Sequence, residues 1–203
     1  MRIRPATIDE ARWCAGVVAA ALLDDPVGRR AVRTRHDRLR RMTGLYEAEL
    51  RLGAFAHGHV DVAVEDDGES ILGVAAWVRP DACSDLAATV RQAPRYVHAI
   101  GIAHAVSAIR ALLRRRRARP DAAHWLLADV AVVEHARGRG IGAALLQHGL
   151  ERCDGAVYLE ATTPGSQRLY ERHGFVVHRR IGLVDGGFPL GMWRERDAAL
   201  ATR

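Results

Sequence analysis

Two arginines and three glycines alternate in a short stretch of the chain, ARGRGIGAAL, at residues 136–145. Glycine lets the backbone N–H groups of a loop approach a ligand closely, and arginine adds positive charge. The apolar run before it, HWLLADVAVV (124–133), is typical of a strand that is covered on both faces. The run after it, IGAALLQHGLERC (141–153), has helical periodicity. A strand, a glycine loop and a helix in this order predict an anion-binding loop, because the positive end of the helix dipole faces the loop.

Two better-known phosphate-binding motifs do not fit this loop. A P-loop needs a lysine followed by serine or threonine, and this chain contains no lysine among its 30 basic residues. A dinucleotide-binding loop has the spacing G-x-G-x-x-G after the first strand. Here the spacing is R-x-x-G-x-G, from Arg137 to Gly142, and the loop lies late in the chain.

The stretch VAVVEHARGRGIGAALL (130–146) resembles the acetyl-CoA loop of the GNAT superfamily of N-acetyltransferases, whose signature is [Q/R]-x-x-G-x-[G/A]. Downstream, LYERHGF (169–175) resembles the second motif of that superfamily, a helix whose tyrosine lies near the thioester sulfur. More narrowly, VYLEATTPGSQRLYERHGF (157–175) and the order of the elements resemble the puromycin N-acetyltransferase group. The similarity in element order covers nearly the whole chain, whereas the specific motifs lie within 124–175.

The resemblance implies that acetyl-CoA is the cosubstrate and that backbone N–H groups from Gly138 to Ala143 hold its pyrophosphate. A strand that splays from its neighbour would hold the pantetheine arm. Ser166 stands where relatives often carry an asparagine, and it would cap its helix or bond the pantetheine amide. The cofactor-binding residues that we expect are Val130, Ala131, Val132, Arg137, Gly138, Arg139, Gly140, Ile141, Gly142, Ala143, Ser166 and Tyr170. For the two arginines, the alternative is a solvated loop position.

Acetyl transfer to an amine requires a base for the amine proton and an acid for the departing thiolate. The resemblance assigns the acid to Tyr170. Glu160 and Asp129 are the candidate bases, because a carboxylate within a largely apolar strand is costly unless it is paired or functional. Pairing with an arginine is the alternative for each. Four histidines could act instead: His124, His135, His173 and His178.

The rest of the chain predicts one mixed α/β sheet. The resemblance specifies the GNAT fold: a mixed, mostly antiparallel sheet flanked by helices, with a splayed strand pair that binds acetyl-CoA and a helical insert between the third and fourth strands. Thr7 and Glu10 have the spacing of a capping box at the first helix. We expect residues 1–203 to form a single domain. The expected strands are 2–6, 60–66, 71–78, 124–133, 156–162 and a closing hairpin at 175–195, and the helical segments are 7–25, 33–58, 80–120, 141–153 and 164–174.

Composition narrows the class of partner. The net charge of +6 and the Arg114–Arg117 run could indicate nucleic acid, but an arginine run at a helix end is also favoured by the helix dipole, and base-stacking aromatics are missing around it. We therefore expect no nucleic-acid partner. No apolar run is long enough to cross a membrane, and the N-terminus does not resemble a signal peptide, so we expect a cytoplasmic protein. Three scattered cysteines suggest neither disulfides nor a metal site. A homodimer through the closing hairpin is possible.

The function that the resemblance implies is direct transfer of an acetyl group from acetyl-CoA to the primary amine of a small molecule, in a ternary complex. An aminonucleoside or another antibiotic, and hence antibiotic resistance, is the more specific expectation. Residues 25–58 and 80–120 are the expected acceptor-site segments. In or beside them, Tyr46, Phe55, Trp77 and Tyr96 could line a pocket or pack in the core. The alternatives are a protein N-terminus or lysine as acceptor, and a non-catalytic CoA-binding regulatory protein.

Overall fold

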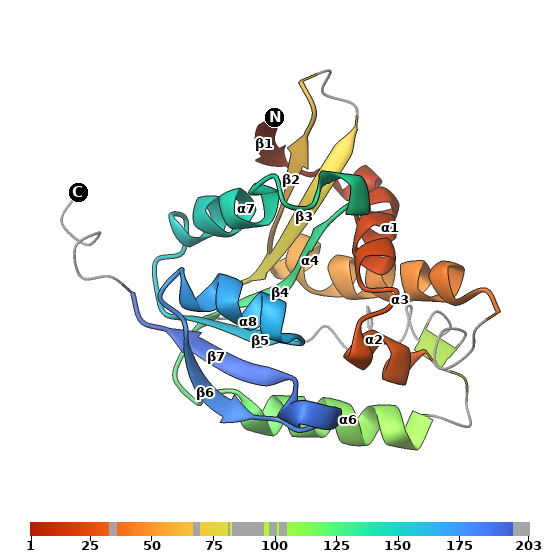
Figure 1. Cartoon of the computed structure of the whole chain (residues 1–203), viewed down its shortest axis with the longest axis vertical. Helices are drawn as coiled ribbons and strands as arrows, with labels where there is room; N and C mark the ends of the chain where they lie inside the picture. The colour runs from red at the N-terminus through yellow and green to blue at the C-terminus, as the bar shows by residue number, and fades with distance from the viewer. Residues whose placement is uncertain are drawn as a thin grey trace.

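A seven-stranded mixed sheet forms the centre of the computed structural model (Figure 1), which describes residues 1–32, 36–66, 70–80, 82, 96–97, 101 and 105–196. The strand order is β1-β2-β3-β4-β5-β7-β6, and β4 and β5 run parallel while the other neighbours are antiparallel. This is the mixed, mostly antiparallel sheet that we predicted. The strands are β1 (Arg2–Pro5), β2 (Gly58–Val64), β3 (Ile71–Val78), β4 (Trp125–Val132), β5 (Val157–Ala161), β6 (Val176–Arg180) and β7 (Leu190–Arg194).

Helices cover both faces of this sheet, so the core has two layers. On one face, α1 and α3 bury the apolar side chains of β2 and β3, such as Val62 and Val74. On the other, α7 and α8 pack against Leu159 and its neighbours. Helix α6 lies along the β5–β7–β6 end of the sheet (Figure 1). The helices are α1 (Ala11–Ala21), α2 (Pro26–Ala31), α3 (Arg38–Leu52), α4 (Ala54–His57), α6 (Ala105–Ala118), α7 (Ile141–Leu150) and α8 (Pro164–Glu171), with 3-10 turns at Ile8–Glu10, Glu134–Ala136 and Asp185–Gly187.

The order of elements in the structure agrees with the predicted order, except that α2 lies between the first two expected helical segments, where no helix was predicted. Two expected segments are interrupted: the first helix ends at Ala21, and the second helical region divides at Gly53 into α3 and α4. Within the expected helical segment 80–120, the structure contains helix α6. Most of residues 81–104 lie outside the described residues. Residues 67–69, between β2 and β3, also lie outside them. In the described part of the chain, no helix is long and apolar enough to span a membrane.

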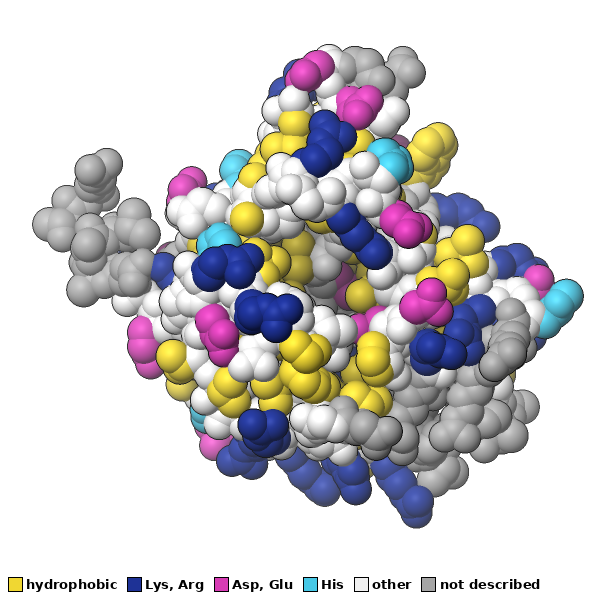
Figure 2. Space-filling model, in the orientation of Figure 1, with side chains coloured by type: hydrophobic (Ala, Val, Ile, Leu, Met, Phe, Trp, Pro, Cys, Tyr) yellow, Lys and Arg dark blue, Asp and Glu magenta, His cyan; other side chains and the backbone are white. Residues whose placement is uncertain are grey.

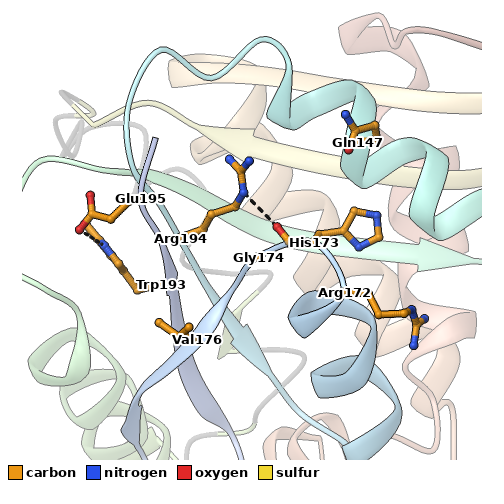
Figure 3. A pocket seen from close by; sticks show the side chains of 8 residues that line it. All are labelled: Gln147, Arg172, His173, Gly174, Val176, Trp193, Arg194 and Glu195. Carbon is orange, nitrogen blue, oxygen red and sulfur yellow. Dashed lines mark hydrogen bonds between the residues drawn. The ribbon is translucent and has the colours of Figure 1, made fainter. Parts of the chain in front are cut away.

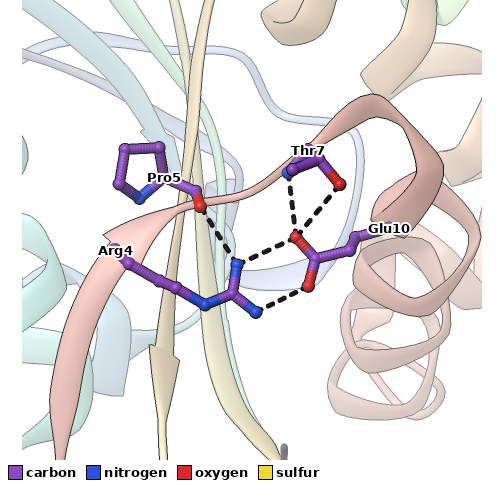
Figure 4. Close-up of polar contacts among 4 residues, drawn as sticks. All are labelled: Arg4, Pro5, Thr7 and Glu10. Atoms are coloured by element: carbon purple, nitrogen blue, oxygen red, sulfur yellow. Dashed lines mark hydrogen bonds and ion pairs between the residues drawn. The ribbon is translucent and has the colours of Figure 1, made fainter. Parts of the chain in front are cut away.

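The chain start is tied to the first helix by one carboxylate (Figure 4). Glu10 accepts a hydrogen bond from the backbone N–H of Thr7 at 2.9 Å, as the predicted capping box requires. Arg4 approaches both oxygens of the same carboxylate, at 2.9 and 2.6 Å. The hydrogen bond from Arg4 is the largest cause that lowers the pKa of Glu10 to about 2, and this effect outweighs partial burial. Strand β1 is thereby fixed to the turn that leads into α1.

Candidate active site

Strands β4 and β5 separate part of the way along their length. They pair only from Trp125–Val157 to Leu127–Leu159, although β4 continues to Val132 and β5 to Ala161. The register between β3 and β4 shifts at the same point, because Asp129 pairs with Ala76 whereas Leu127 pairs with Trp77. Ala128 is therefore an extra residue, and a bulge of this kind bends the strand that carries it. The predicted splayed pair is present, and the bulge accounts for it.

The glycine loop follows this free end of β4. Gly138 and Gly140 have φ values of +78° and +77°, a backbone conformation that favours glycine. A Cβ atom at either position would meet nothing within 4 Å, so the space before the loop is open. The amide of Ala144 makes the first intrahelical bond of α7, to Gly140 O at 2.9 Å. The N–H groups of the residues before it have no intrahelical acceptor, and this arrangement suits a phosphate.

The two loop arginines have different surroundings. Arg137 donates to two backbone carbonyls, of Ala21 at 3.1 Å and of Val132 at 3.4 Å, and so joins the end of α1 to the end of β4. Arg139 lies 3.8 Å from the carboxylate of Glu65 and is exposed. Arg137 therefore also has a structural function, and Arg139 is the more accessible of the two cations.

The side chains of the free part of β4 alternate between the two faces. Val130 and Val132 pack into the α7–α8 core, and Ala131 packs into the core under α1. Asp129 shares the face of Ala131 because it is two residues away. The valine side chains are thus core, as their type suggests, and Asp129 lies on the face opposite α7 and α8.

Tyr170 is buried at the edge of the α7–α8 core, with 6% of its surface exposed. Its ring contacts that of Phe175 edge-on, with 6.0 Å between the centroids. Burial raises the pKa of Tyr170, and the carboxylates of Asp129 and Asp25 raise it further. The phenol is therefore protonated at neutral pH, and Asp129 is near enough to act on it electrostatically.

Helix α8, which carries Tyr170, begins with a reciprocal cap. Thr163 N donates to the hydroxyl of Ser166 at 3.1 Å, and Ser166 N donates to the hydroxyl of Thr163 at 3.2 Å. The Ser166 hydroxyl also lies 2.9 Å from Thr163 O. Of the two functions expected for Ser166, capping is the one that these contacts provide.

Glu160 is the more constrained of the two predicted bases. Its Oε2 accepts a hydrogen bond from Arg115 Nε on α6 at 2.6 Å, and only 6% of its side chain is exposed. This is the arginine pairing that the sequence left as the alternative. Its other oxygen, Oε1, is buried without a hydrogen-bond partner in the part of the chain that the structure describes.

Asp129 has no such contact, and it is joined by a carboxylate that the sequence analysis missed. Burial raises the pKa of Asp129 to about 6, although the charge of Arg115 lowers it. Burial likewise raises the pKa of Glu49, on α3, to about 7, and the charge of Asp129 adds to this effect. Both pKa values lie in the range that a general base at neutral pH requires. Glu49 gave no signal in the sequence, because an acid on an amphipathic helix is usually a solvated side chain.

The molecular surface has one clear hollow on this face. Figure 2 shows the hollow near the centre of the face, with acidic side chains visible inside it. Comparison with Figure 1 places it between α8 on one side and α1 and α2 on the other. Solvent reaches the side chain of Glu49, although its pKa responds to a strongly desolvating environment.

The other candidates do not join this group. His124 packs edge-on against Tyr158 and Trp193, each with 5.5 Å between centroids, and His173 is hydrogen-bonded to Leu169 O at 2.9 Å. His135 and His178 are exposed. Among the predicted pocket aromatics, Trp77 is fully buried in the core and Phe55 packs beside α1 and α3, while Tyr46 and Tyr96 each pack against the core cluster that contains Met42.

One cavity lies away from the glycine loop, Asp129 and Tyr170. It measures about 520 Å³ at the end of α8 and the end of β7, where Arg172, Trp193 and Glu195 line it (Figure 3). Trp193 Nε1 donates to Glu195 at 2.8 Å across its edge. Of the predicted candidates, His173 lines this cavity, whereas the loop residues, Asp129, Glu160 and Tyr170 do not. Its position therefore gives it no part in the chemistry considered above.

The described residues contain no group of three or more histidine, cysteine or acidic side chains that could hold a metal ion. Cys14 and Cys153 are free thiols, and burial raises the pKa of each to about 12. Such thiols are poor nucleophiles at neutral pH. Cys83 lies outside the described residues.

Comparison with known proteins points to one family. Residues 56–177 match the model of the acetyltransferase (GNAT) domain. A crystal structure from Corynebacterium glutamicum, titled as histone acetyltransferase HPA2 and related acetyltransferase, is 34% identical, with a TM-score of 0.75 and coverage of 96% of each chain. Two more distant structures share the fold at 16% identity. Arylalkylamine N-acetyltransferase 2 from Aedes aegypti has a TM-score of 0.67 and coverage of 97% and 99%, and a GNAT family acetyltransferase from Brucella melitensis in complex with acetyl-CoA has 0.50, with 97% and 88%.

Proposed function

Because this chain belongs to the acetyltransferase (GNAT) family, we propose that it moves the acetyl group of acetyl-CoA to the amine of a small molecule, directly and within a ternary complex. The observation that carries the proposal is the arrangement at the β4–β5 separation. An open glycine loop, whose N–H groups have no intrahelical acceptor, follows β4. The carboxylate of Asp129 lies on the face of β4 that is opposite α7 and α8. Cosubstrate and acceptor can thus approach from different sides.

The loop residues fit the cosubstrate. The N–H groups from Gly138 to Ala143 would hold the pyrophosphate, with Arg139 near enough to add charge and Arg137 holding the loop in place. The backbone of Val130–Val132, no longer paired with β5, would bind the amide groups of the pantetheine arm. Ser166 would contribute by capping the helix that carries Tyr170.

The chemistry requires two proton transfers. The amine nitrogen attacks the thioester carbon, and Asp129 would accept a proton from it. Tyr170 would donate its proton to the departing CoA thiolate, since its raised pKa keeps it protonated until that point. Glu160 remains a candidate base, but its contact with Arg115 makes it less available than Asp129. It would act more readily by holding Arg115 and α6 beside the site.

The acceptor would enter through the segments 25–58 and 80–120, of which the described parts supply Tyr46, Glu49 and Arg115. Aromatic and acidic side chains of this kind suit a small amine. The narrower suggestion of an aminonucleoside or another antibiotic rests on the likeness of residues 157–175 to the puromycin N-acetyltransferase group.

The test is release of free CoA thiol from acetyl-CoA in the presence of a panel of amines: puromycin, aminoglycosides, polyamines, arylalkylamines and amino acids. We expect turnover with at least one small amine and a loss of about 10- to 100-fold in kcat for Tyr170→Phe. Gly140→Val should abolish acetyl-CoA binding by calorimetry, because valine is strained at a φ of +77°, while the fold survives. Tight acetyl-CoA binding without turnover of any amine would indicate a CoA-binding regulatory protein instead.

A protein acceptor is the second candidate. It is favoured by the likeness to the 34% identical Corynebacterium glutamicum protein, which is described as histone acetyltransferase HPA2 and related acetyltransferase. Lysine-containing peptides and free N-terminal peptides belong in the same assay. Turnover of peptides but not of free small amines would select this candidate.

A further inference from the structure

Helix α6 carries five arginines and no acidic residue among its 14 residues. One of the five, Arg115, turns toward the sheet and donates a hydrogen bond to Glu160 on β5 at 2.6 Å. The side chains of the other four are exposed and make no hydrogen bond or ion pair with any residue that the structure describes: Arg110, Arg114, Arg116 and Arg117. Figure 2 shows dark blue side chains along the lower margin of the molecule, where Figure 1 places α6. This margin therefore carries a concentrated positive charge that the described residues do not neutralise.

The outward surface of α6 is divided into two stripes. Three large aliphatic side chains at i, i+3 and i+4 form an apolar stripe that is 42–55% exposed: Ile109, Leu112 and Leu113. Three arginines at i, i+4 and i+7 form a basic stripe: Arg110, Arg114 and Arg117. The side toward the sheet is a third one, where Arg115 meets Glu160 and Ala118 is only 3% exposed. The helix therefore presents apolar and basic side chains to solvent next to each other.

Neither stripe helps the chain to fold. Like charges three and four residues apart destabilise a helix, and the basic stripe consists of such pairs. The helix dipole favours cations in the last turn, which accounts for Arg116 and Arg117, but Arg110 and Arg114 lie before that turn. Aliphatic side chains that stay in water forgo the stabilisation that burial would give. A partner that covers both stripes would remove both costs.

An anionic lipid bilayer has the chemistry that both stripes require. Its phosphates attract arginine, and its acyl chains accept aliphatic side chains. A bilayer is also broad and flat, which suits a helix at the margin of the molecule (Figure 1). Nucleic acid offers phosphates but no apolar layer, and α6 contains no aromatic side chain that could stack on bases. Strand β6, beside α6, extends the basic surface with the exposed Arg179 and Arg180.

We propose that α6 binds the surface of an anionic lipid bilayer. The apolar stripe enters the boundary between headgroups and acyl chains, and the long arginine side chains reach the phosphates around it. The helix lies in the plane of the membrane, because the contact between Arg115 and Glu160 keeps its inner side on the sheet. The proposal concerns where the protein binds in a cell, and it does not depend on the function proposed above.

Cosedimentation of the full chain with lipid vesicles tests the charge requirement. The vesicles consist of phosphatidylcholine alone or of phosphatidylcholine mixed with phosphatidylglycerol. We expect binding to the anionic vesicles to be stronger by about tenfold or more at low salt, because each arginine near the surface adds attraction. Arg110→Gln/Arg114→Gln should weaken this binding by about tenfold or more. The matched control is Arg168→Gln/Arg172→Gln, which removes two exposed arginines with the same spacing from α8 and should weaken it by about twofold or less.

A second pair of variants tests insertion at constant charge. Leu113→Ser should weaken binding to the anionic vesicles by about three- to tenfold, because a hydroxyl group gains nothing from the acyl chains. Ile8→Ser removes an aliphatic side chain of similar exposure, 47%, from the turn before α1, and it should leave vesicle binding unchanged. All the substituted side chains are exposed, so thermal denaturation should show that each variant stays folded.

Three results would each overturn the proposal: equal binding to neutral and anionic vesicles, no binding to either, and an equal loss in the two double variants. Unchanged binding by Leu113→Ser would show that the protein only adsorbs by charge and does not insert the apolar stripe. Binding of duplex DNA or polyglutamate without binding of vesicles would assign this face to nucleic acid or to an acidic protein instead. The vesicle assay needs neither acetyl-CoA nor an amine, so its outcome is separate from that of the thiol-release test.

Discussion

Asp61 and Asp129 are carboxylates on two inner strands of the same sheet, and their surroundings differ. Asp61, on β2, is fully buried and accepts a hydrogen bond from Arg152 at 2.6 Å, with His59 at 3.5 Å and His148 at 3.9 Å. Asp129, on β4, has no direct partner among the described residues and has its pKa raised to about 6. The charge of Asp61 is neutralised by contact with Arg152, whereas the carboxylate of Asp129 stays available to accept a proton.

The difference follows from where each strand segment lies. Asp61 is in the fully paired middle of β2, on the face that α7 covers, so its charge must be matched within the protein. Asp129 lies where β4 has left β5, on the face of α1 and α3. Burying a charge without a partner is costly, so its persistence at Asp129 indicates a function. The predictions below test this division.

The largest effect should come from Asp129→Asn. Because the amide cannot accept the amine proton, kcat/KM for an accepted amine should fall by about 10²- to 10⁴-fold. The affinity for acetyl-CoA, measured by calorimetry, should change little. An activity within threefold of wild type would place the base elsewhere, at Glu160 or Glu49.

Asp61→Asn should lower the stability of the fold and leave the activity unchanged. It leaves Arg152 without its buried partner and should lower the free energy of unfolding by about 1–3 kcal/mol. The melting temperature should fall by roughly 2–10 °C, measured by thermal denaturation at pH 7. The activity per folded molecule should match the wild type, and a selective loss of activity would break the comparison.

The raised pKa of Asp129 predicts a smaller stability effect of the opposite sign. A carboxyl group with a pKa raised from 3.8 to about 6 destabilises the fold progressively as the pH rises through that interval, and fully above it. Asp129→Asn should therefore raise the melting temperature at pH 8 by about 2–4 °C, which corresponds to about 1 kcal/mol after allowance for solvent screening. At pH 3.5 the two melting temperatures should coincide.

The smallest effect belongs to Glu10, whose pKa is lowered rather than raised. Its interaction with Arg4 and Thr7 contributes stability above a pH of about 4.5, and this contribution is lost as the pH falls toward 2. Glu10→Gln should cost at most about 1 kcal/mol at pH 7, because both partners are partly exposed. At pH 2 denaturation curves of the variant and the wild type should overlap.

Local patterns predicted most of the fold. The apolar run at 124–133, the alternating strands and the glycine loop each reflect backbone geometry over a few residues, so the order of elements in the structure agrees with the prediction except at α2. The sequence likewise identified Gly138 and Gly140 in the loop and Ser166 at the helix cap, because each acts within its own segment. The predicted functions of these residues stay predictions.

Long-range contacts were invisible in the sequence. The contact between Glu160 and Arg115, 45 positions away, depends on how α6 packs against the sheet. The effect of Asp129 on Glu49 depends in the same way on the packing of α3. Arg137 is a second example of a long-range contact, since its guanidinium donates a hydrogen bond to a carbonyl at the end of α1, 116 residues earlier.

The sequence by itself determined the strand–loop–helix unit, the order of the elements and the residue types available for chemistry. Tertiary structure alone decided which carboxylates are neutralised and which stay available, because a pKa depends on solvent exclusion and on charges brought near by packing. The bulge at Ala128 lies where β4 leaves β5, and burial in the folded chain is the main cause that raises the pKa values of Asp129 and Glu49.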